Sequence, residues 1–175
     1  MSSAEGNLTW EPAAGHPDLL AAPVAAAIAG TPSARVAPID ADLADTAAFC
    51  AAYDVAMESS ANCVVVAGKR GGDVRYAAVL VLASMRADVN GAIRRHLDVR
   101  KISFAPMDTA VSLTGMEYGG ITPIGLPADW PILVDEAVVA AGDVVIGSGI
   151  RGSKVLVPAA ELAALPSAEV LALAL

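Results

Sequence analysis

The sequence predicts a mixed α/β domain whose sheet is curved or barrel-like, largely antiparallel and flanked by helices. Runs of β-branched and apolar residues outnumber the segments with helical periodicity. Two of these runs, residues 63–67 and 76–84, are separated by the segment GKRGGD, whose glycines suit the loop of an antiparallel hairpin. No regular alternation of strand and helix follows, so a doubly wound parallel sheet is not expected.

Length and composition are those of one compact domain. The 175 residues are 55% hydrophobic with a mean hydropathy of +0.57, enough to bury a substantial core. No apolar run reaches the roughly 18–20 residues that a membrane-spanning helix needs. No basic segment followed by an apolar block stands near Met1, so the sequence predicts a cytoplasmic protein. We expect an irregular N-terminal arm over residues 1–17 and a single domain over residues 18–175.

The first elements of the domain are a helix, a strand and a second helix. Residues 19–29 are Ala-rich and typical of a helix, with Pro23 in its first turn. Residues 35–39 are typical of a short strand. Asp42 is expected to cap the second helix, because an aspartate side chain accepts hydrogen bonds from free N–H groups at a helix start.

After the hairpin, short helices alternate with short strands. Asp88 is expected to cap a helix, and Asp108 to open a helical turn that Gly115 ends in the left-handed conformation. Pro158 suits the first turn of a last helix that continues to Leu165. The expected strands of this half cover residues 102–104, 131–134, 144–146 and 154–157.

Charge restricts what the chain can bind. A net charge of −8 argues against a broadly basic nucleic-acid surface, because phosphate contacts need clustered Lys and Arg. The cations are nevertheless gathered in a few places, so they form either a local basic face that meets the end of an RNA or a scatter of solvated charges. They include Lys69, Arg70, Arg75, Arg86, Arg94, Arg95, Arg100, Lys101, Arg151 and Lys154.

The sequence predicts neither a metal nor a cofactor. Cys50 and Cys63 are not a C-x-x-C pair and stand in apolar surroundings, which predicts buried thiols. Two histidines and no carboxylate cluster leave no plausible ligand set for a metal. The segment GSGIRG at 147–152 fits the glycine pattern of a dinucleotide site, but a strand follows it where such a site requires a helix.

The segment LTGMEYGGITPIGLP, residues 113–127, is too rich in glycine and proline for a helix or an ordinary strand. Its glycines permit positive φ or a close backbone approach, and its prolines fix φ. The segment therefore predicts either a shaped loop that presents backbone groups to a ligand or a plain connection between two strands.

Within this segment, the pattern TG-x-x-x-GGI-x-P-x-G resembles the signature loop of the YbaK/EbsC-like, prolyl-tRNA-synthetase-associated editing domains. The resemblance covers residues 62–165, through the strands CVVVA and YAAVLVLAS, a helix before RKISFA, the loop, PILVDE and GSGIRGSKVLVPAAEL. It implies the fold of that family and an aminoacyl-tRNA deacylase acting in trans, which hydrolyses the ester of mischarged tRNA. The implied partners are the acceptor end of a tRNA carrying an amino acid and an aminoacyl-tRNA synthetase, without metal, cofactor or membrane.

The resemblance also implies site residues. The family holds its substrate with a lysine on the strand facing the loop, and a loop glycine orients the ribose or the attacking water. These positions fall on Asn62 and Gly119, the implied catalytic residues. The implied substrate-binding residues are Thr114, Gly120, Ile121, Thr122, Pro123, Gly125, Asp135, Ser148, Gly149 and Arg151.

Asn62 departs from the family pattern, because it is a neutral donor where a cation is expected. Three alternatives stay open. In the first, Asn62 suffices for a different substrate. In the second, either Lys69 or Arg151 reaches into the site. In the third, the chain is a non-catalytic module that binds an amino acid or a tRNA end.

Overall fold

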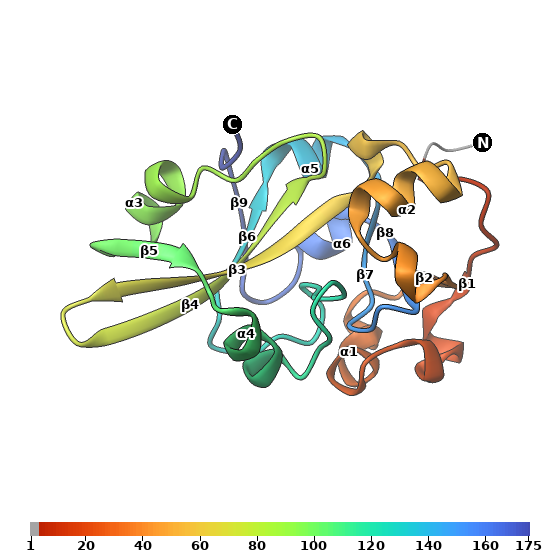
Figure 1. Cartoon of the computed structure of the whole chain (residues 1–175), viewed down its shortest axis with the longest axis horizontal. Coiled ribbons are helices and arrows are strands. Elements are labelled where there is room, and N and C mark those ends of the chain that lie inside the picture. Colours follow the sequence, from red (N-terminus) through yellow and green to blue (C-terminus); the bar gives the residue numbers. More distant parts are fainter. Residues whose placement is uncertain (1–3) are drawn as a thin grey trace.

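The computed structural model describes residues 4–175, whose strands form two sheets flanked by short helices (Figure 1). This arrangement confirms the mixed α/β class. Residues 1–3 of the predicted N-terminal arm lie outside the described residues. The rest of the arm packs onto the body of the molecule, since Ala4 and Ala13 are both buried.

The first sheet combines two strands from the N-terminal part of the chain with two strands from residues 143–158. It is antiparallel throughout and contains, in spatial order, β1 (Glu11–Pro12), β2 (Arg35–Pro38), β8 (Ser153–Pro158) and β7 (Asp143–Gly147). β8 lies between β2 and β7, and its residues 153–157 are all buried. A side chain on β8 is therefore held by neighbours on both sides.

The second sheet is built around the predicted hairpin. Its spatial order is β5 (Lys101–Phe104), β3 (Ala61–Arg70), β4 (Asp73–Leu82), β6 (Ile132–Asp135) and β9 (Ala168–Leu171). β3 pairs antiparallel with β4 from Ala61 opposite Leu82 to Arg70 opposite Asp73, which confirms the hairpin. β6 and β9 add to β4 in parallel, so this sheet is mixed.

Successive side chains of β4 point to opposite faces of the second sheet, and both faces are buried there. Leu80 joins the core shared with the first sheet, whereas Val79 packs on the opposite face with Ile93. A parallel bridge between Ser60 and Val145 connects the start of β3 to β7. The two sheets thus continue into one curved wall, as the sequence predicts.

The helices are short, and α1, α5 and α6 pack residues into the core beside the strands. They are α1 (Ala22–Ala27), α2 (Thr46–Tyr53), α3 (Arg94–Leu97), α4 (Met107–Thr114), α5 (Glu136–Ala140) and α6 (Ala159–Ala163). Single helical turns add to them at Ala13–Gly15, Pro17–Leu19, Ile28–Gly30, Ala41–Leu43, Met57–Ser59 and Val89–Ile93. Within residues 4–175 no helix has the length and apolarity needed to cross a bilayer.

The helix signals predicted at Asp88 and Gly115 are confirmed. Asp88 caps the turn before α3 and accepts a hydrogen bond from the Ala92 amide at 3.0 Å. Gly115 ends α4 with φ of 69°. The cap predicted at Asp42 is wrong, because Asp42 lies inside a separate turn and α2 begins only after Asp45.

Candidate functional site

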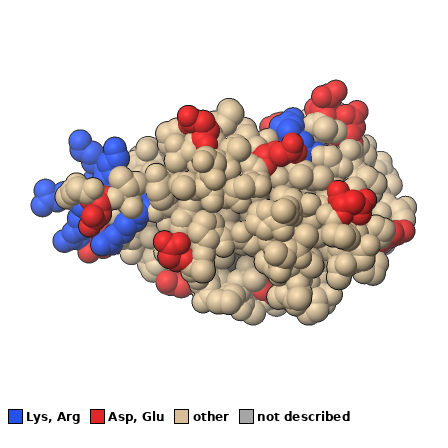
Figure 2. Space-filling view, turned by 90° about the horizontal axis from the view of Figure 1, so that it is seen from below, with Lys and Arg blue, Asp and Glu red and all other residues tan. Residues whose placement is uncertain are grey.

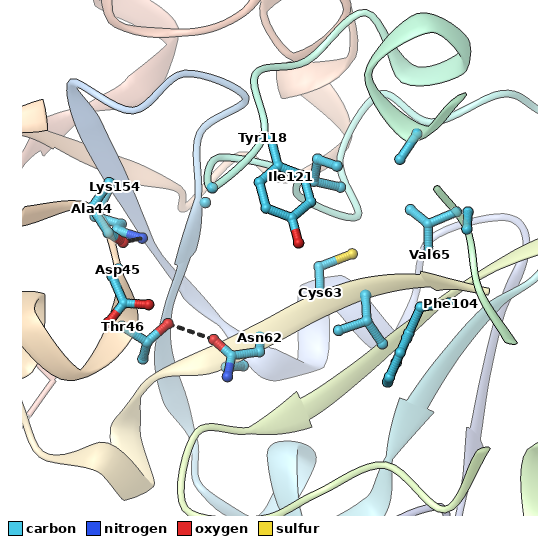
Figure 3. A pocket seen from close by; sticks show the side chains of 16 residues that line it. Ala44, Asp45, Thr46, Asn62, Cys63, Val65, Phe104, Tyr118, Ile121 and Lys154 are labelled. Atoms are coloured by element: carbon cyan, nitrogen blue, oxygen red, sulfur yellow. Dashed lines mark hydrogen bonds between the residues drawn. The ribbon is translucent and has the colours of Figure 1, made fainter. Parts of the chain in front are cut away.

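A cavity of about 410 Å³ lies where the first half of β3 faces the loop that follows α4 (Figure 3). This volume suits a small organic ligand. Both sheets, the start of α2 and the signature loop contribute to its wall. The lining residues are Ala44, Asp45, Thr46, Ala61, Asn62, Cys63, Val64, Val65, Phe104, Ala105, Ala110, Tyr118, Gly119, Ile121, Gly147 and Lys154.

Asn62 stands on β3 at the floor of the cavity, half-buried. Its side-chain oxygen accepts a hydrogen bond from the Thr46 hydroxyl at 2.6 Å, which orients the amide (Figure 3). Among the residues that the structure describes, no acceptor takes a hydrogen bond from the amide nitrogen. That nitrogen keeps two donors for a ligand.

Lys154 lies across the cavity from Asn62 (Figure 3) and brings a positive charge that the sequence prediction placed on the surface. Its side chain comes from β8 and the residue is only 8% exposed. Nζ donates to the Ala44 carbonyl at 3.1 Å and lies 5.3 Å from the centre of the Phe49 ring. Burial lowers the pKa of Lys154, since leaving water disfavours the charged form.

The cysteines are not equipped as nucleophiles. Cys63 lines the cavity, and burial raises the pKa of its thiol to about 12, so almost no thiolate exists near neutral pH. Cys50 is buried in α2, and burial likewise raises the pKa of its thiol. The chemistry of this cavity therefore rests on hydrogen bonding and charge.

The signature loop reaches the cavity through Tyr118, Gly119 and Ile121. Gly119 is exposed and has φ of 91°, a conformation that favours glycine. Behind it, the loop is fastened to the turn after β7 by backbone hydrogen bonds. The Glu117 amide donates to the Gly149 carbonyl at 2.8 Å, and the Gly149 amide donates to the Gly120 carbonyl at 2.7 Å.

Most residues that the resemblance assigned to substrate binding lie outside the cavity wall. The Thr114 hydroxyl donates a hydrogen bond to the Ala110 carbonyl at 2.7 Å. The Ser148 hydroxyl donates to the backbone carbonyls of Ile150 and Ser153. The predicted residues absent from the cavity wall are Thr114, Gly120, Thr122, Pro123, Gly125, Asp135, Ser148, Gly149 and Arg151.

Asp135 is a structural residue. It is 2% exposed and caps α5 through the Ala137 amide at 3.1 Å. Its other carboxylate oxygen accepts from the amides of Leu173 and Ala174 at 2.8 and 3.1 Å. The last two hydrogen bonds hold the C-terminal segment against β6, and Asp135 has no part in the cavity wall.

Neither cation proposed as a substitute for the missing lysine lines the cavity. Lys69 is exposed near the tip of the β3–β4 hairpin. The Arg151 guanidinium bridges two segments beside the cavity, donating to the carbonyls of Tyr118 at 3.3 Å and Ala41 at 3.1 Å. Lys154, grouped in the sequence with the exposed cations, is the lysine that the cavity contains. A lysine inside the apolar run of a strand is the signal that could have identified it.

Comparison with known proteins concerns the family and the fold. The profile of the aminoacyl-tRNA editing domain matches residues 40–165, which include both Asn62 and Lys154. No curated protein sequence matches the chain significantly.

Solved structures share the fold. A candidate trans-editing enzyme for prolyl tRNA synthetase is 23% identical, with a TM-score of 0.76 over 89% of this chain and 96% of that one. A structure from the computational grafting of epitope backbones onto scaffold proteins is 22% identical, with a TM-score of 0.76 over 89% and 97% of the two chains. A hypothetical protein is 20% identical, with a TM-score of 0.73 over 82% and 92%.

These identities are low, so the structural likeness establishes the fold alone. The profile match is the stronger finding, because it spans most of the chain and contains the loop, β3 and β8. The chain belongs to the aminoacyl-tRNA editing domain family.

Proposed function

We propose that this protein is an aminoacyl-tRNA deacylase that acts in trans on mischarged tRNA. The observation that carries the proposal is one cavity, in a chain of the editing family, that gathers Asn62, Gly119 and the buried cation of Lys154. Its volume of about 410 Å³ suits an amino acid with part of the adjoining ribose. The fold shared with a candidate trans-editing enzyme supports action in trans.

The proposed reaction is hydrolysis of the ester between the amino acid and the terminal ribose. A water oxygen attacks the carbonyl carbon, the bond to the ribose oxygen breaks, and the products are a free amino acid and a ribose hydroxyl. This ester is already activated, so the protein needs to position ester and water and to stabilise the developing oxyanion.

The proposal gives Lys154, Asn62 and Gly119 separate roles. Lys154 stabilises the oxyanion, because a positive charge in water-poor surroundings interacts strongly with developing negative charge. Asn62 donates from its amide nitrogen to the aminoacyl carbonyl or ribose, and Thr46 holds it in that orientation. Gly119 lets the loop backbone approach the ribose or the attacking water.

The role of Asn62 is testable by truncation. Asn62→Ala is expected to lower kcat/KM for deacylation roughly 10- to 100-fold, which corresponds to losing a transition-state contact of about 1.4–2.7 kcal/mol. Thr46→Val should cause a smaller loss, because it removes only the group that orients Asn62, and Thr46→Ser should retain activity. Deacylation of a panel of mischarged tRNAs measures these effects. A rate for Asn62→Ala within twofold of wild type would remove Asn62 from the reaction.

A second function has one observation in its favour. Asn62 is neutral and already hydrogen-bonded to Thr46, so the cavity lacks the lysine that the family resemblance implies on β3. A module that binds an amino acid or tRNA end without hydrolysing it would tolerate this loss. Binding of a non-hydrolysable aminoacyl-adenosine amide, together with no turnover of any mischarged tRNA, would favour the binding module over the deacylase.

A further inference from the structure

The free end of the β3–β4 hairpin carries a concentrated positive charge. Segments 69–75 and 94–101 contain seven of the chain's 11 Lys and Arg residues but two of its 19 Asp and Glu residues. Figure 2 shows these cations gathered at one end of the molecule, with acidic residues spread over the remainder of the visible face. The seven, all exposed, are Lys69, Arg70, Arg75, Arg94, Arg95, Arg100 and Lys101.

Like charges are held close together at this end. Lys69 on β3 stands directly opposite Lys101 on β5, so both side chains point to the same face of the sheet. Such a pair destabilises a sheet, and nothing in the packing requires it, since both residues are exposed. An anionic ligand would offset the repulsion.

Several of the arginines are already ordered. Arg70 pairs with Asp98 at 2.5 Å, the Arg75 guanidinium donates to the Leu97 carbonyl at 3.4 Å, and Arg94 Nε donates to the Asn90 carbonyl at 3.1 Å. A guanidinium that uses only part of its five donors in this way can still bind a phosphate. Arg70, Arg75 and Arg100 line a depression on this surface.

The spacing between this surface and the cavity is fixed by β3. Lys69 lies seven residues beyond Asn62 on the same strand, which corresponds to about 23 Å at 3.3 Å per residue. Lys69 shares its face of β3 with the cavity residues Cys63 and Val65, whereas Asn62 and Val64 point to the other face, because alternate residues point the same way. A ligand that reaches both sites must be long and anionic.

We propose that the hairpin end, defined as the seven cations above, binds backbone phosphates of a tRNA whose aminoacylated 3′ end occupies the cavity. This inference rests on the proposed function, because it assigns the partner of the same site. The separation of about 23 Å along β3 places the contact on nucleotides beyond the terminal one. Recognition through phosphates is independent of base sequence, so the hairpin end sets affinity and orientation while the cavity selects the amino acid.

The test uses the full chain and two double variants of equal charge. Lys69→Gln/Lys101→Gln removes two cations of the hairpin end, and the control Arg35→Gln/Arg86→Gln removes two cations elsewhere. The probe is uncharged tRNA, titrated over a range of salt concentrations. The hairpin variant is expected to bind roughly 10-fold more weakly at low salt and to lower the slope of log Kd against log salt by about 1 to 2. The control should match wild type.

A second measurement separates this inference from the deacylase proposal. With an aminoacyl ester of adenosine as a minimal substrate, the hairpin variant should hydrolyse at the wild-type rate, although its kcat/KM for full mischarged tRNA falls about 10-fold. An unchanged salt slope would overturn the RNA contact and point to an acidic protein as the partner of this surface. An equal loss on the minimal ester would also overturn it. Absence of hydrolysis by wild type on both substrates would instead refute the deacylase, while the binding titration still decides the RNA contact.

Discussion

Lys154→Met is expected to slow deacylation of mischarged tRNA about 100-fold while the protein stays folded. Methionine retains most of the side-chain volume that β8 buries but removes the only positive charge among the described cavity-lining residues. A hydrogen bond to a charged group contributes about 1.5–3 kcal/mol, and a 100-fold loss of rate corresponds to about 2.7 kcal/mol. Single-turnover hydrolysis at saturating protein measures the chemical step directly.

In Lys154→Met, the stability of the fold is expected to change in the opposite direction from the activity. Because burial lowers the pKa of Lys154, the folded protein binds fewer protons than the unfolded chain between the lowered pKa and the ordinary one. The free energy of unfolding of wild type should therefore rise with pH across that alkaline window. Lys154→Met should lack this rise. A residue that merely supported the fold would instead lose stability together with activity.

A lysine placed on β3 tests whether a cation from another strand can restore the activity lost in Lys154→Met. Asn62→Lys in the Lys154→Met background returns one positive charge to the same cavity from the strand where the family resemblance implies it. The double variant is expected to recover a measurable part of the lost rate. If Lys154→Met retains wild-type activity, the buried lysine has no role in catalysis, whatever the double variant does.

Gly125→Ala is expected to destabilise the protein by about 3 kcal/mol. Gly125 has φ of 86°, and a Cβ there would lie 2.4 Å from the Pro23 carbonyl oxygen and 2.7 Å from its carbon. The left-handed conformation costs roughly 1–2 kcal/mol and overpacking about 1–3 kcal/mol, and backbone atoms cannot rotate out of the way. Chemical denaturation measures the loss as a shift of the unfolding midpoint.

The matched control is Gly72→Ala in the hairpin turn. Gly72 is exposed, does not have positive φ, and a Cβ there would meet nothing within 4 Å. This variant should stay within about 0.5 kcal/mol of wild type. Equal stabilities for the two variants would show that the loop can move away from the segment at Pro23. The prediction also separates two uses of glycine in the signature loop, since Gly125 serves packing whereas Gly119 faces the cavity.

The features that the sequence predicts well are those determined by neighbouring residues. The hairpin follows from two β-rich runs and a glycine-rich turn, and the end of α4 follows from one glycine in the left-handed region. The start of α2 was misplaced because Asp42 and Asp45 both suit a cap, and local sequence does not choose between them.

The features that the sequence did not predict depend on long-range pairing. The parallel addition of β6 and β9 to β4 has no local signature, because it is decided by where intervening segments pack. Lys154 enters the cavity only because β8 lies between β2 and β7, with its residues 153–157 buried. Asn62 and the loop were expected to meet, and they do, yet the partner Thr46 comes from a helix start that was misplaced.

Hydrolysis of a panel of tRNAs, each mischarged with a different amino acid, tests the deacylase proposal most directly when wild type and Lys154→Met are compared side by side. Wild type should release the amino acid from at least one mischarged tRNA well above the spontaneous rate, and Lys154→Met should be about 100-fold slower on that same substrate. No release from any tRNA by wild type, with an aminoacyl-adenosine amide still bound in the cavity, would contradict the deacylase and leave the binding module.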